Sequence, residues 1–394
     1  MPGRKTINVA LFGAGFMGKA HSNAYLKVNK FFDLPADVVM HTLVDTQPGL
    51  ARTVADRWGW QRASSDVAAV LADPDIDLVD ICVPNNGHAQ LVKAAARAGK
   101  PVACEKPLAC TMAQAEQAAA AVVSAGVPSF IWFCYRRVPA VTLARQLIDE
   151  GRIGRVYHFR ATYLQDWVMD PNFPLVWRLR KEVAGSGSHG DLNAHLIDTA
   201  RYLVGEFDEV VGHQQTFVKH RPLEGKPSER GLAGVTATGG RKGPVTVDDA
   251  TMFLARFAGG AMGTFEATRF ARGRKNDHGF EINGEKGSLV FRFDQMNDLL
   301  FFDASAPKHV QGFTKIQASD AVHPYSVYWP TGHWTGYEHA FVNQLSDMVR
   351  ALAGGKKSAL KFRPTFADGL ACQRVLAAVE KSSTSRRWVK VATV

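Results

Sequence analysis

The sequence predicts an α/β protein with two domains: a doubly wound parallel sheet in residues 1–135, then an α+β domain with a large, mostly antiparallel, open-faced sheet in residues 136–394. Apolar strand-like runs alternate with helical segments up to residue 135, as in a parallel sheet covered on both faces. A glycine-rich turn follows the first run. Beyond residue 136 the strand-like segments follow one another, separated by turn pairs typical of hairpins.

In the first domain, apolar runs predict the strands, and helical spacing with proline starts and glycine ends predicts the helices. Strands are expected at 7–12, 38–45, 76–84, 101–105 and 128–135, and helices at 16–30, 48–59, 88–100 and 111–126. Pro48 lies at the start of one helix, and Gly99 and Gly126 close two others.

In the second domain, alternating segments predict strands, with hairpin turns at Gly259-Gly260 and Asn283-Gly284. Strands are expected within 156–167, 209–220, 250–270 and 280–293, and helices at 139–151, 189–204, 336–355 and 366–382. Residues 221–245, rich in glycine, proline and charge, favour a mobile loop. The last helix is expected either in this domain or packed back on the first.

The composition is that of a globular protein, with 46% apolar and 21% charged residues. No run approaches the roughly 18 apolar residues of a membrane span, and the start does not resemble a signal peptide, so we expect a cytoplasmic protein. The five cysteines lack C-x-x-C spacing, which argues against a metal site or a disulfide framework. The net charge of +10 is spread along the chain without a nucleic-acid-binding motif. It is compatible with attraction of anionic cofactors or substrates, and solvated surface charge with no specific role explains most of the lysines and arginines.

The turn "FGAGFMG" contains Gly13-x-Gly15-x-x-Gly18 between a strand and a helix, the context of a dinucleotide-binding Rossmann fingerprint. Glycines permit close approach of a pyrophosphate, and the helix N-terminus offers free N–H donors. The intervening Phe16 and Met17 are expected at the same cofactor. Asp45, at the end of the second strand, suits the ribose hydroxyls of NAD and would repel the 2′-phosphate of NADP. The alternative is that Asp45 caps the next helix.

Polar side chains also follow two other strands, at the edge where open α/β sheets bind ligands. Pro84, Asn85 and His88 follow one strand, and Glu105 and Lys106 follow another. Turn chemistry explains the asparagine equally well, and a lysine at a strand end is commonly solvated. Pro107 restricts the Lys106 backbone to extended geometry.

The segment "GSGSHGDLNAHLID" places Asp191 and His195 four residues apart on one helical face, which Asp198 continues. A carboxylate beside an imidazole orients it and favours its charged form, as a general base requires. For an isolated pair, a capping aspartate and a core histidine form the simpler interpretation.

Together, the glycine turn followed by "KAHSNAY", then "CEKPLA", then "GSGSHGDLNAHLID" resemble the Gfo/Idh/MocA family of oxidoreductases over essentially the whole chain. Within the family the pattern is most similar to the levoglucosan dehydrogenase-type branch, whose members oxidise pyranose rings.

The resemblance implies roles for individual residues. Lys106, Asp191 and His195 match the catalytic residues, and the Lys106–Pro107 bond is expected to be cis. Trp177 and Arg178 are expected near the nicotinamide or the sugar. The substrate-binding set implied is Lys106, Tyr135, Gln165, Arg178, Asp191 and His195, with NAD as cofactor and no metal. Cys134, His189 and Asn193 depart from the family pattern, and the last two leave the substrate's identity open.

The resemblance thus implies NAD-dependent oxidation of a ring secondary hydroxyl in a pyranose sugar, anhydrosugar, glycoside or cyclitol. One alternative is an NAD-dependent glycoside-cleaving enzyme that oxidises the ring transiently. A remote one is a non-catalytic sensor of NAD or sugar. The family's sheet commonly pairs with another subunit, so a homodimer or homotetramer is expected.

Overall fold

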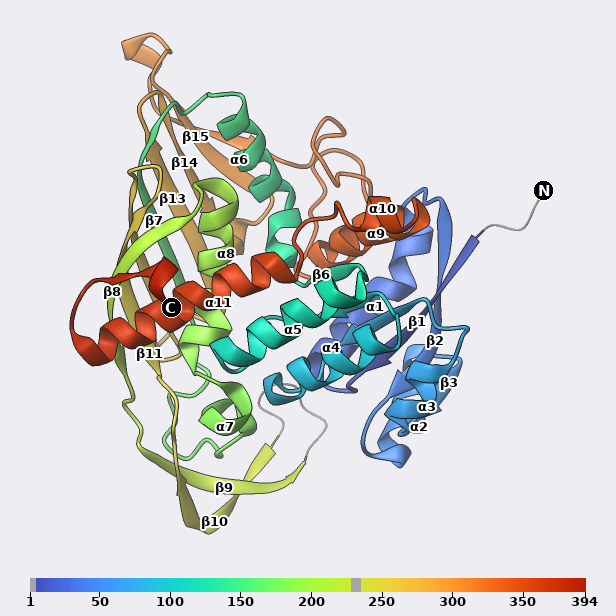
Figure 1. The fold of residues 1–394 in the computed structure, drawn as a ribbon. Coiled ribbons are helices and arrows are strands. Elements are labelled where there is room, and N and C mark those ends of the chain that lie inside the picture. Colours follow the sequence, from blue (N-terminus) through green and yellow to red (C-terminus); the bar gives the residue numbers. More distant parts are fainter. Residues whose placement is uncertain (1–4, 228–234) are drawn as a thin grey trace. The chain divides into compact units, whose positions relative to one another are not determined.

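The computed structural model describes residues 5–227 and 235–394 (Figure 1). These residues form two compact units. The first joins the chain up to Cys134 with Tyr337–Ala371, and the second contains Tyr135–Gly336 and Cys372–Val394. The sequence placed all of 136–394 in one domain, whereas Tyr337–Ala371 returns to the first unit.

The sheet of the first unit has six parallel strands among the described residues, in the order β3-β2-β1-β4-β5-β6. This is the doubly wound order of dinucleotide-binding folds, which confirms the predicted Rossmann sheet. The strand order reverses between β1 and β4, so ligands are expected at the carboxyl ends of these two strands. The strands are β1 Lys5–Phe12, β2 Ala36–Val44, β3 Arg62–Ser64, β4 Leu78–Ile81, β5 Val102–Cys104 and β6 Ser129–Ile131.

The helices of the first unit begin and end largely where the sequence predicted. They are α1 Phe16–Phe31, α2 Pro48–Trp58, α3 Val67–Ala72, α4 His88–Arg97, α5 Met112–Ala125, α9 His339–Ala353 and α10 Lys356–Ala359. Gly59 and Gly126 end α2 and α5 in the left-handed conformation that glycine allows. α9 belongs here because Phe341 packs on the rings of His21 and Trp132.

The main sheet of the second unit has nine strands among the described residues, in the order β16-β15-β14-β13-β7-β12-β11-β8-β17. Neighbouring strands are antiparallel except β7 and β12, which confirms the mostly antiparallel sheet. Its strands are β7 Val156–Leu164, β8 Phe207–Gln215, β11 Ala250–Phe257, β12 Met262–Thr268, β13 Asp277–Gly284, β14 Gly287–Arg292, β15 Asp298–Asp303, β16 Phe313–Gln317 and β17 Val389–Lys390.

Side chains alternate across this sheet. In β11, Phe253 and Phe257 are buried while Met252 and Leu254 are exposed. The helices of the unit are α6 Pro139–Asp149, α7 Lys181–Ala184, α8 Ala194–Leu203 and the C-terminal part of α11 Phe366–Ser385. Figure 1 shows α6 and α8 on the same side of the strands.

Two local expectations were wrong, and a third, the helix at 189–204, is confirmed with a different start. The expected loop 221–245 contains strands β9 His220–Pro227 and β10 Val235–Pro244, which pair with each other, and its residues 228–234 lie outside the described chain. The turn after β13 is formed by residues 285–286, because Asn283 already pairs with Ser288. The expected helix 189–204 begins as a π-helix, His189–Asn193, before α8.

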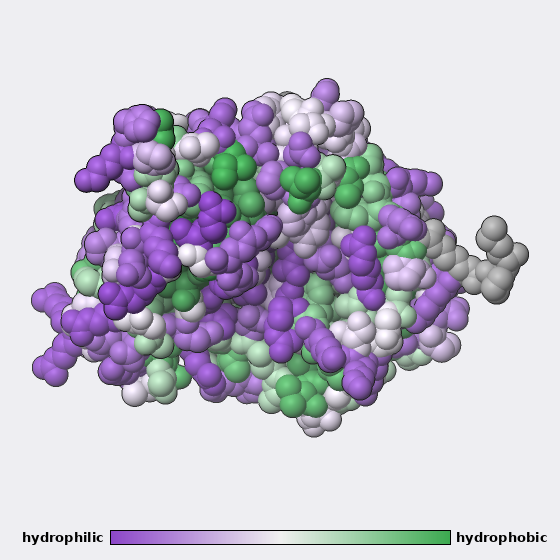
Figure 2. Space-filling view, turned by 90° about the horizontal axis from the view of Figure 1, so that it is seen from above, coloured by the Kyte–Doolittle hydropathy of each residue, from purple (hydrophilic) through white to green (hydrophobic). Residues whose placement is uncertain are grey.

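Within the described ranges, no helix combines the length and apolar character needed to cross a membrane. Hydrophilic side chains predominate on the face seen in Figure 2, where hydrophobic ones form small separate groups.

Candidate active site

The glycine loop after β1 shows why each of its glycines is needed. Gly13 has a φ of +109°, and a Cβ there would lie 2.8 Å from the carbonyl oxygen of Cys82. A Cβ on Gly18 would lie 2.0 Å from the carbonyl oxygen of Gly13. Around Gly15, by contrast, no described atom lies within 4 Å of a built Cβ, so this side of the loop is open to a ligand. Phe16 begins α1 and is 41% exposed, with Met17 beside it.

Asp45 joins the end of β2 to this loop. Its Oδ2 accepts the N–H of Ala14 at 3.0 Å, and its Oδ1 accepts the N–H of Gln47 at 3.0 Å. The N-cap of α2 is Gln47, so Asp45 is not the helix cap considered as the alternative. A carboxylate oxygen has a further lone pair, which leaves Asp45 able to accept from ribose hydroxyls.

Glu105 and Lys106 follow β5, and the Lys106–Pro107 peptide bond is cis. Glu105 is 4% exposed, and its Oε2 accepts the N–H of Lys106 at 3.0 Å. Its buried carboxylate therefore contacts the lysine backbone, whereas the sequence placed it at the cofactor.

After β4, Pro84 precedes the 3₁₀ turn Asn85–Gly87. His88 is fully buried, with Nδ1 at 2.9 Å from the carbonyl oxygen of Pro107 and Nε2 at 3.0 Å from that of Val83. These contacts occupy both ring nitrogens of a residue that the sequence assigned to cofactor binding.

In the second unit, Asp191 lies within the π-helix and His195 in the first turn of α8. A π-helical turn changes the angular spacing of side chains and is frequent at functional sites. The Asp191 carboxylate accepts a hydrogen bond from Arg269 Nη2 at 2.7 Å. Arg269 is 1% exposed and lies over the ring of Trp167, at 5.3 Å. No sequence pattern singled out Arg269, because it is one basic residue among many.

His195 is 8% exposed and stacks on Tyr135 with 4.3 Å between ring centroids. A chain of hydrogen bonds continues from that tyrosine. The Tyr163 hydroxyl donates to Asn276 Oδ1 at 2.9 Å, so the Tyr135 hydroxyl, 3.1 Å away, donates to Tyr163. Gln165 Nε2 donates to the same Asn276 oxygen at 2.8 Å. The structure thus brings three predicted residues, Tyr135, Gln165 and His195, into one polar and aromatic cluster.

Two members of this cluster, Tyr163 and Asn276, were not predicted. Tyr163 shares a strand face with Gln165, which is the only sequence signal that could have indicated it. Asn276 precedes β13 in a charged segment and has no such signal.

The Arg178 guanidinium lies over the Trp177 ring at 4.3 Å, in the 3₁₀ turn Trp177–Leu179. The backbone carbonyl of Arg178 accepts from Arg269 at 3.4 Å, which links this turn to the arginine that holds Asp191.

His189 and Asn193, which depart from the family pattern, make their hydrogen bonds within the second unit. Both are fully buried, Asn193 Nδ2 donates to His189 Nδ1 at 3.1 Å, and His189 Nε2 donates to the Leu376 carbonyl at 3.0 Å. They therefore tie the start of this helix to α11. Asp198, which continues the predicted face, forms a buried bidentate ion pair with Arg136.

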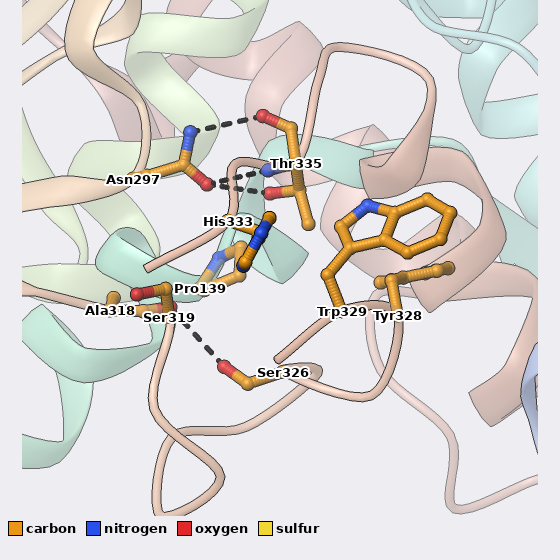
Figure 3. Close-up of a pocket in the computed structure, with 9 residues that line it drawn as sticks. All are labelled: Pro139, Asn297, Ala318, Ser319, Ser326, Tyr328, Trp329, His333 and Thr335. Atoms are coloured by element: carbon orange, nitrogen blue, oxygen red, sulfur yellow. Dashed lines mark hydrogen bonds between the residues drawn. The ribbon is translucent and has the colours of Figure 1, made fainter. Parts of the chain in front are cut away.

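A separate small pocket in the second unit, shown in Figure 3, is lined by the loop that contains Trp329 and His333. Its cavity volume of about 10 Å³ is close to the space that one water needs. Asn297 forms three hydrogen bonds with Thr335 along its wall. These contacts fold the loop, and the pocket contains no predicted site residue.

The six-stranded order, the open glycine loop and the acidic end of β2 are the features of a dinucleotide-binding domain. Comparison with known families agrees. The model of the oxidoreductase family with an NAD-binding Rossmann fold matches residues 7–132, and the GFO/IDH/MocA C-terminal domain matches residues 141–290. The chain belongs to the Gfo/Idh/MocA family, as its sequence motifs predicted, and its cofactor is NAD.

Individual relatives match nearly end to end. The chain is 43% identical to levoglucosan dehydrogenase of Pseudarthrobacter phenanthrenivorans over 98% of both chains. It superimposes with a TM-score of 0.91 on an oxidoreductase domain protein from Kribbella flavida, 47% identical over 98% and 99% of the two chains. The TM-score is also 0.91 for levoglucosan dehydrogenase in complex with NADH and levoglucosan, 41% identical over 98% and 100%.

Proposed function

We propose that this enzyme oxidises a ring secondary hydroxyl of a pyranose sugar, anhydrosugar, glycoside or cyclitol, with NAD as hydride acceptor. The observation that carries the proposal is the 43% identity with levoglucosan dehydrogenase over nearly the full length of both chains. Levoglucosan, an anhydrosugar, is therefore the first substrate to test.

In the proposed reaction, His195 removes the proton of the hydroxyl, and Lys106 donates a hydrogen bond to the same oxygen. The alcohol carbon loses a hydride and becomes a carbonyl carbon. For each alcohol oxidised, one proton goes to His195 and one hydride to the cofactor, so the reaction is balanced. NAD, when bound, supplies the hydride acceptor. Asp191 orients His195 and stabilises its charged form, and the ion pair with Arg269 keeps the Asp191 carboxylate in one place. Lys106 belongs to the first unit and the other residues to the second, so their joint action is part of the proposal.

The polar cluster supports a substrate rich in hydroxyls. Gln165 receives the indole N–H of Trp167 at 2.8 Å and donates to Asn276, so its orientation is set before any ligand binds. The Asn276 side-chain oxygen already accepts two hydrogen bonds, from Tyr163 and Gln165. Asn276 is exposed, and its amide nitrogen therefore points toward other acceptors. We propose that Gln165, Tyr135 and Arg178 contact the sugar and that Trp177 borders the cofactor.

The first test measures NADH formation with levoglucosan, other pyranoses, glycosides and inositols, with NADP in place of NAD as the cofactor control. NADH accumulating with an oxidised sugar supports the proposal. Aglycone release from a glycoside without net NADH would instead favour the glycoside-cleaving alternative, and no reaction with any polyol would contradict both.

The catalytic assignment predicts that Lys106→Ala and His195→Ala keep NAD affinity and lose about 10²–10³-fold in kcat, the usual effect of removing one preorganised donor or base. Steady-state kinetics and NADH fluorescence titration check this. Normal turnover in either variant would contradict its role.

We also propose that the open face of the nine-stranded sheet pairs with a second copy of the chain. Met252, Leu254 and Met262 are 46–55% exposed on adjacent strands β11 and β12. Leu254→Glu is expected to lower the molecular mass measured by light scattering from that of the oligomer toward that of a single chain.

The five cysteines are free, which suits the reducing cytoplasm that we propose as the location.

A further inference from the structure

The Glu105-Lys106-Pro107 segment contacts two buried histidines of the first unit. His21, on α1, is fully buried, with Nδ1 at 2.8 Å from Asp80 Oδ2 and Nε2 at 3.0 Å from Glu105 Oε1. The other oxygen of Glu105 accepts the N–H of Lys106. One continuous chain of contacts therefore runs from Asp80 on β4 through the imidazole to the lysine backbone.

The groups around His21 indicate its charge. Both ring nitrogens face carboxylate oxygens, which accept but do not donate when ionised, so both nitrogens must carry hydrogen. Asp80 also accepts from Tyr25 Oη and Trp132 Nε1, each at 2.8 Å. Burial alone would lower the pKa of His21, but the two carboxylates outweigh it and raise that pKa to about 9.

The other titratable groups facing this imidazole are neutral. Burial and the neighbouring carboxylates raise the pKa values of the Tyr25 hydroxyl and the Cys82 thiol well above their usual range. The Cys82 Sγ lies 3.0 Å from His21 Nδ1. The remaining neighbours are the rings of Trp132 and Phe341, with centroids at 4.2 and 5.5 Å from that of His21.

His88 contacts the segment from its other end. Its Nδ1 lies 2.9 Å from the Pro107 carbonyl oxygen, and its Nε2 lies 3.0 Å from that of Val83, which follows β4. Burial lowers the pKa of His88, which favours a neutral imidazole with a single N–H. That N–H can donate to only one of the two carbonyl oxygens, and on Nδ1 it donates to Pro107.

We propose that His21, as an imidazolium bridging Asp80 and Glu105, and His88, through the Pro107 carbonyl, are positioning residues that fix Lys106 at the end of β5. His21 lies on α1, three residues after Gly18, so it also links the helix that follows the glycine loop to the lysine. The inference rests on the proposed function, in which the Lys106 ammonium contacts the reacting oxygen. An error of about 1 Å in such a group costs about 10²-fold in rate.

Another interpretation of the same residues is a metal site. His21, Asp80 and Cys82 each offer one ligand atom, and these atoms lie within 4.8 Å of one another. However, a metal would need His21 Nδ1 without its hydrogen, and Nδ1 already lies at hydrogen-bonding distance from Asp80. The two interpretations predict different protonation of His21.

The decisive experiment is ¹⁵N NMR of histidine-labelled wild-type protein with NADH at pH 7.5. The proposal expects both His21 nitrogens to be protonated and His88 to be a single neutral tautomer, with His21→Gln and His88→Gln assigning the signals. A neutral His21, or one equivalent of Zn²⁺ retained through His21 and Cys82, would overturn the proposal. This measurement requires no substrate, so its outcome is separate from that of the proposed function.

Kinetics provide the second measurement. His21→Gln and Glu105→Ala are expected to lower kcat for levoglucosan about 10²-fold with little change in NADH affinity, and to increase the primary deuterium isotope effect, because hydride transfer becomes slower than the other steps. Glu105→Gln, which can still accept the Lys106 N–H, should recover part of the loss. His41→Gln, another buried histidine of this unit, is the control and should leave kcat unchanged. Unchanged kcat and isotope effect in folded His21→Gln would contradict the proposal, even if the wild type oxidises sugars.

Discussion

Gly15 is the residue of the glycine loop where an added methyl group meets no described atom of the protein, whereas Gly13 and Gly18 lie against backbone. Its φ of −80° is one that alanine also adopts. A side chain at Gly15 should therefore weaken the binding of the cofactor that approaches this loop and should not change the free energy of unfolding.

We predict that Gly15→Ala weakens NADH binding about tenfold, or about 1.4 kcal/mol, and leaves the free energy of unfolding without ligand nearly unchanged. Gly18→Ala should instead destabilise the fold, because its Cβ would overlap the Gly13 carbonyl oxygen. Gly49→Ala, also in open space, is the matched control for binding. Fluorescence titration and urea unfolding measure the two quantities, and equal binding by wild type and Gly15→Ala would contradict the assignment.

Arg269 supports a second prediction at this scale, because its buried guanidinium donates to Asp191. Arg269→Met should lower kcat about 10²-fold and also lower stability, since the partly buried Asp191 loses its ion pair with Arg269. Arg269→Lys should restore stability more than kcat, because an ammonium keeps the charge but not the planar geometry. Arg256→Met, on an exposed arginine, is the control; a loss of kcat as large in that variant would show that the effect is not local.

Individual residues were predictable where local chemistry marks them. The glycine pattern, Asp45 and the Lys-Pro pair lie next to strand ends and can be found along the chain. Arg269 and Asn276 could not be found this way, because their roles arise from contacts with residues 78 and 111 positions away. Glu105 and His88 lie at the expected edge, but burial directs them to the protein itself.

At the scale of elements, the start of the π-helix depends on Asp248, which precedes β11. Its Oδ1 accepts the N–H of Gly187 at 2.7 Å, and its Oδ2 accepts the N–H of His189 at 2.8 Å and the hydroxyl of Ser188 at 2.6 Å. A Cβ on Gly187 would lie 1.8 Å from the Asp248 carbonyl oxygen, so only glycine permits this approach. The loop and the strand together set where Asp191 lies.

We predict that Asp248→Ala destabilises the protein by about 2–4 kcal/mol, since it leaves several donors to a buried carboxylate without a partner. Turnover should fall as well, because the π-helix carries Asp191. Asp248→Asn, which keeps one acceptor oxygen, should lie between Ala and wild type. Urea unfolding and kcat measure both effects, and an Asp248→Ala protein as stable as wild type would disprove this role.

Elements with strong periodicity were predicted well and irregular ones were not. The alternation of strands and helices located five of the six strands of the first sheet, and β3 was missed because its three residues have no apolar run. The residues of the π-helical start of the 189–204 helix also suit an α-helix, so the sequence alone does not distinguish the two. β9 and β10 have the glycine and proline content of a loop, so their composition predicted a loop where the structure has two strands.

At the scale of the whole chain, the pH dependence of stability reflects buried histidines in both units. In the second unit, burial lowers the pKa of His278 to about 3, and its ring nitrogens have no hydrogen-bond partner among the described residues. It lies among aromatic rings, 5.3 Å from that of Tyr135 and 5.1 Å from that of Tyr163. In the first unit, His21 has the opposite shift, to about 9.

These shifts act on opposite sides of neutral pH. An unfolded histidine binds its proton near pH 6.5, but folded His278 does so only near pH 3, so acid favours the unfolded chain between these values. His21 keeps its proton in the folded state up to about pH 9, so its contribution is complete below pH 6.5 and is lost as the pH rises from 6.5 to 9.

The last prediction follows from the acid side. His278→Phe removes a group that costs up to about 1.4 kcal/mol per pH unit between about pH 6.5 and 3, and it keeps an aromatic ring in an aromatic cluster. We expect the variant to lose stability more slowly than wild type as the pH falls from 7 to 4, so the difference between the two widens with acid. His309→Gln, at an exposed position, is the control and should follow wild type. Urea unfolding at each pH measures the difference, and parallel curves for His278→Phe and wild type would show that His278 binds its proton at the same pH in the folded and unfolded states.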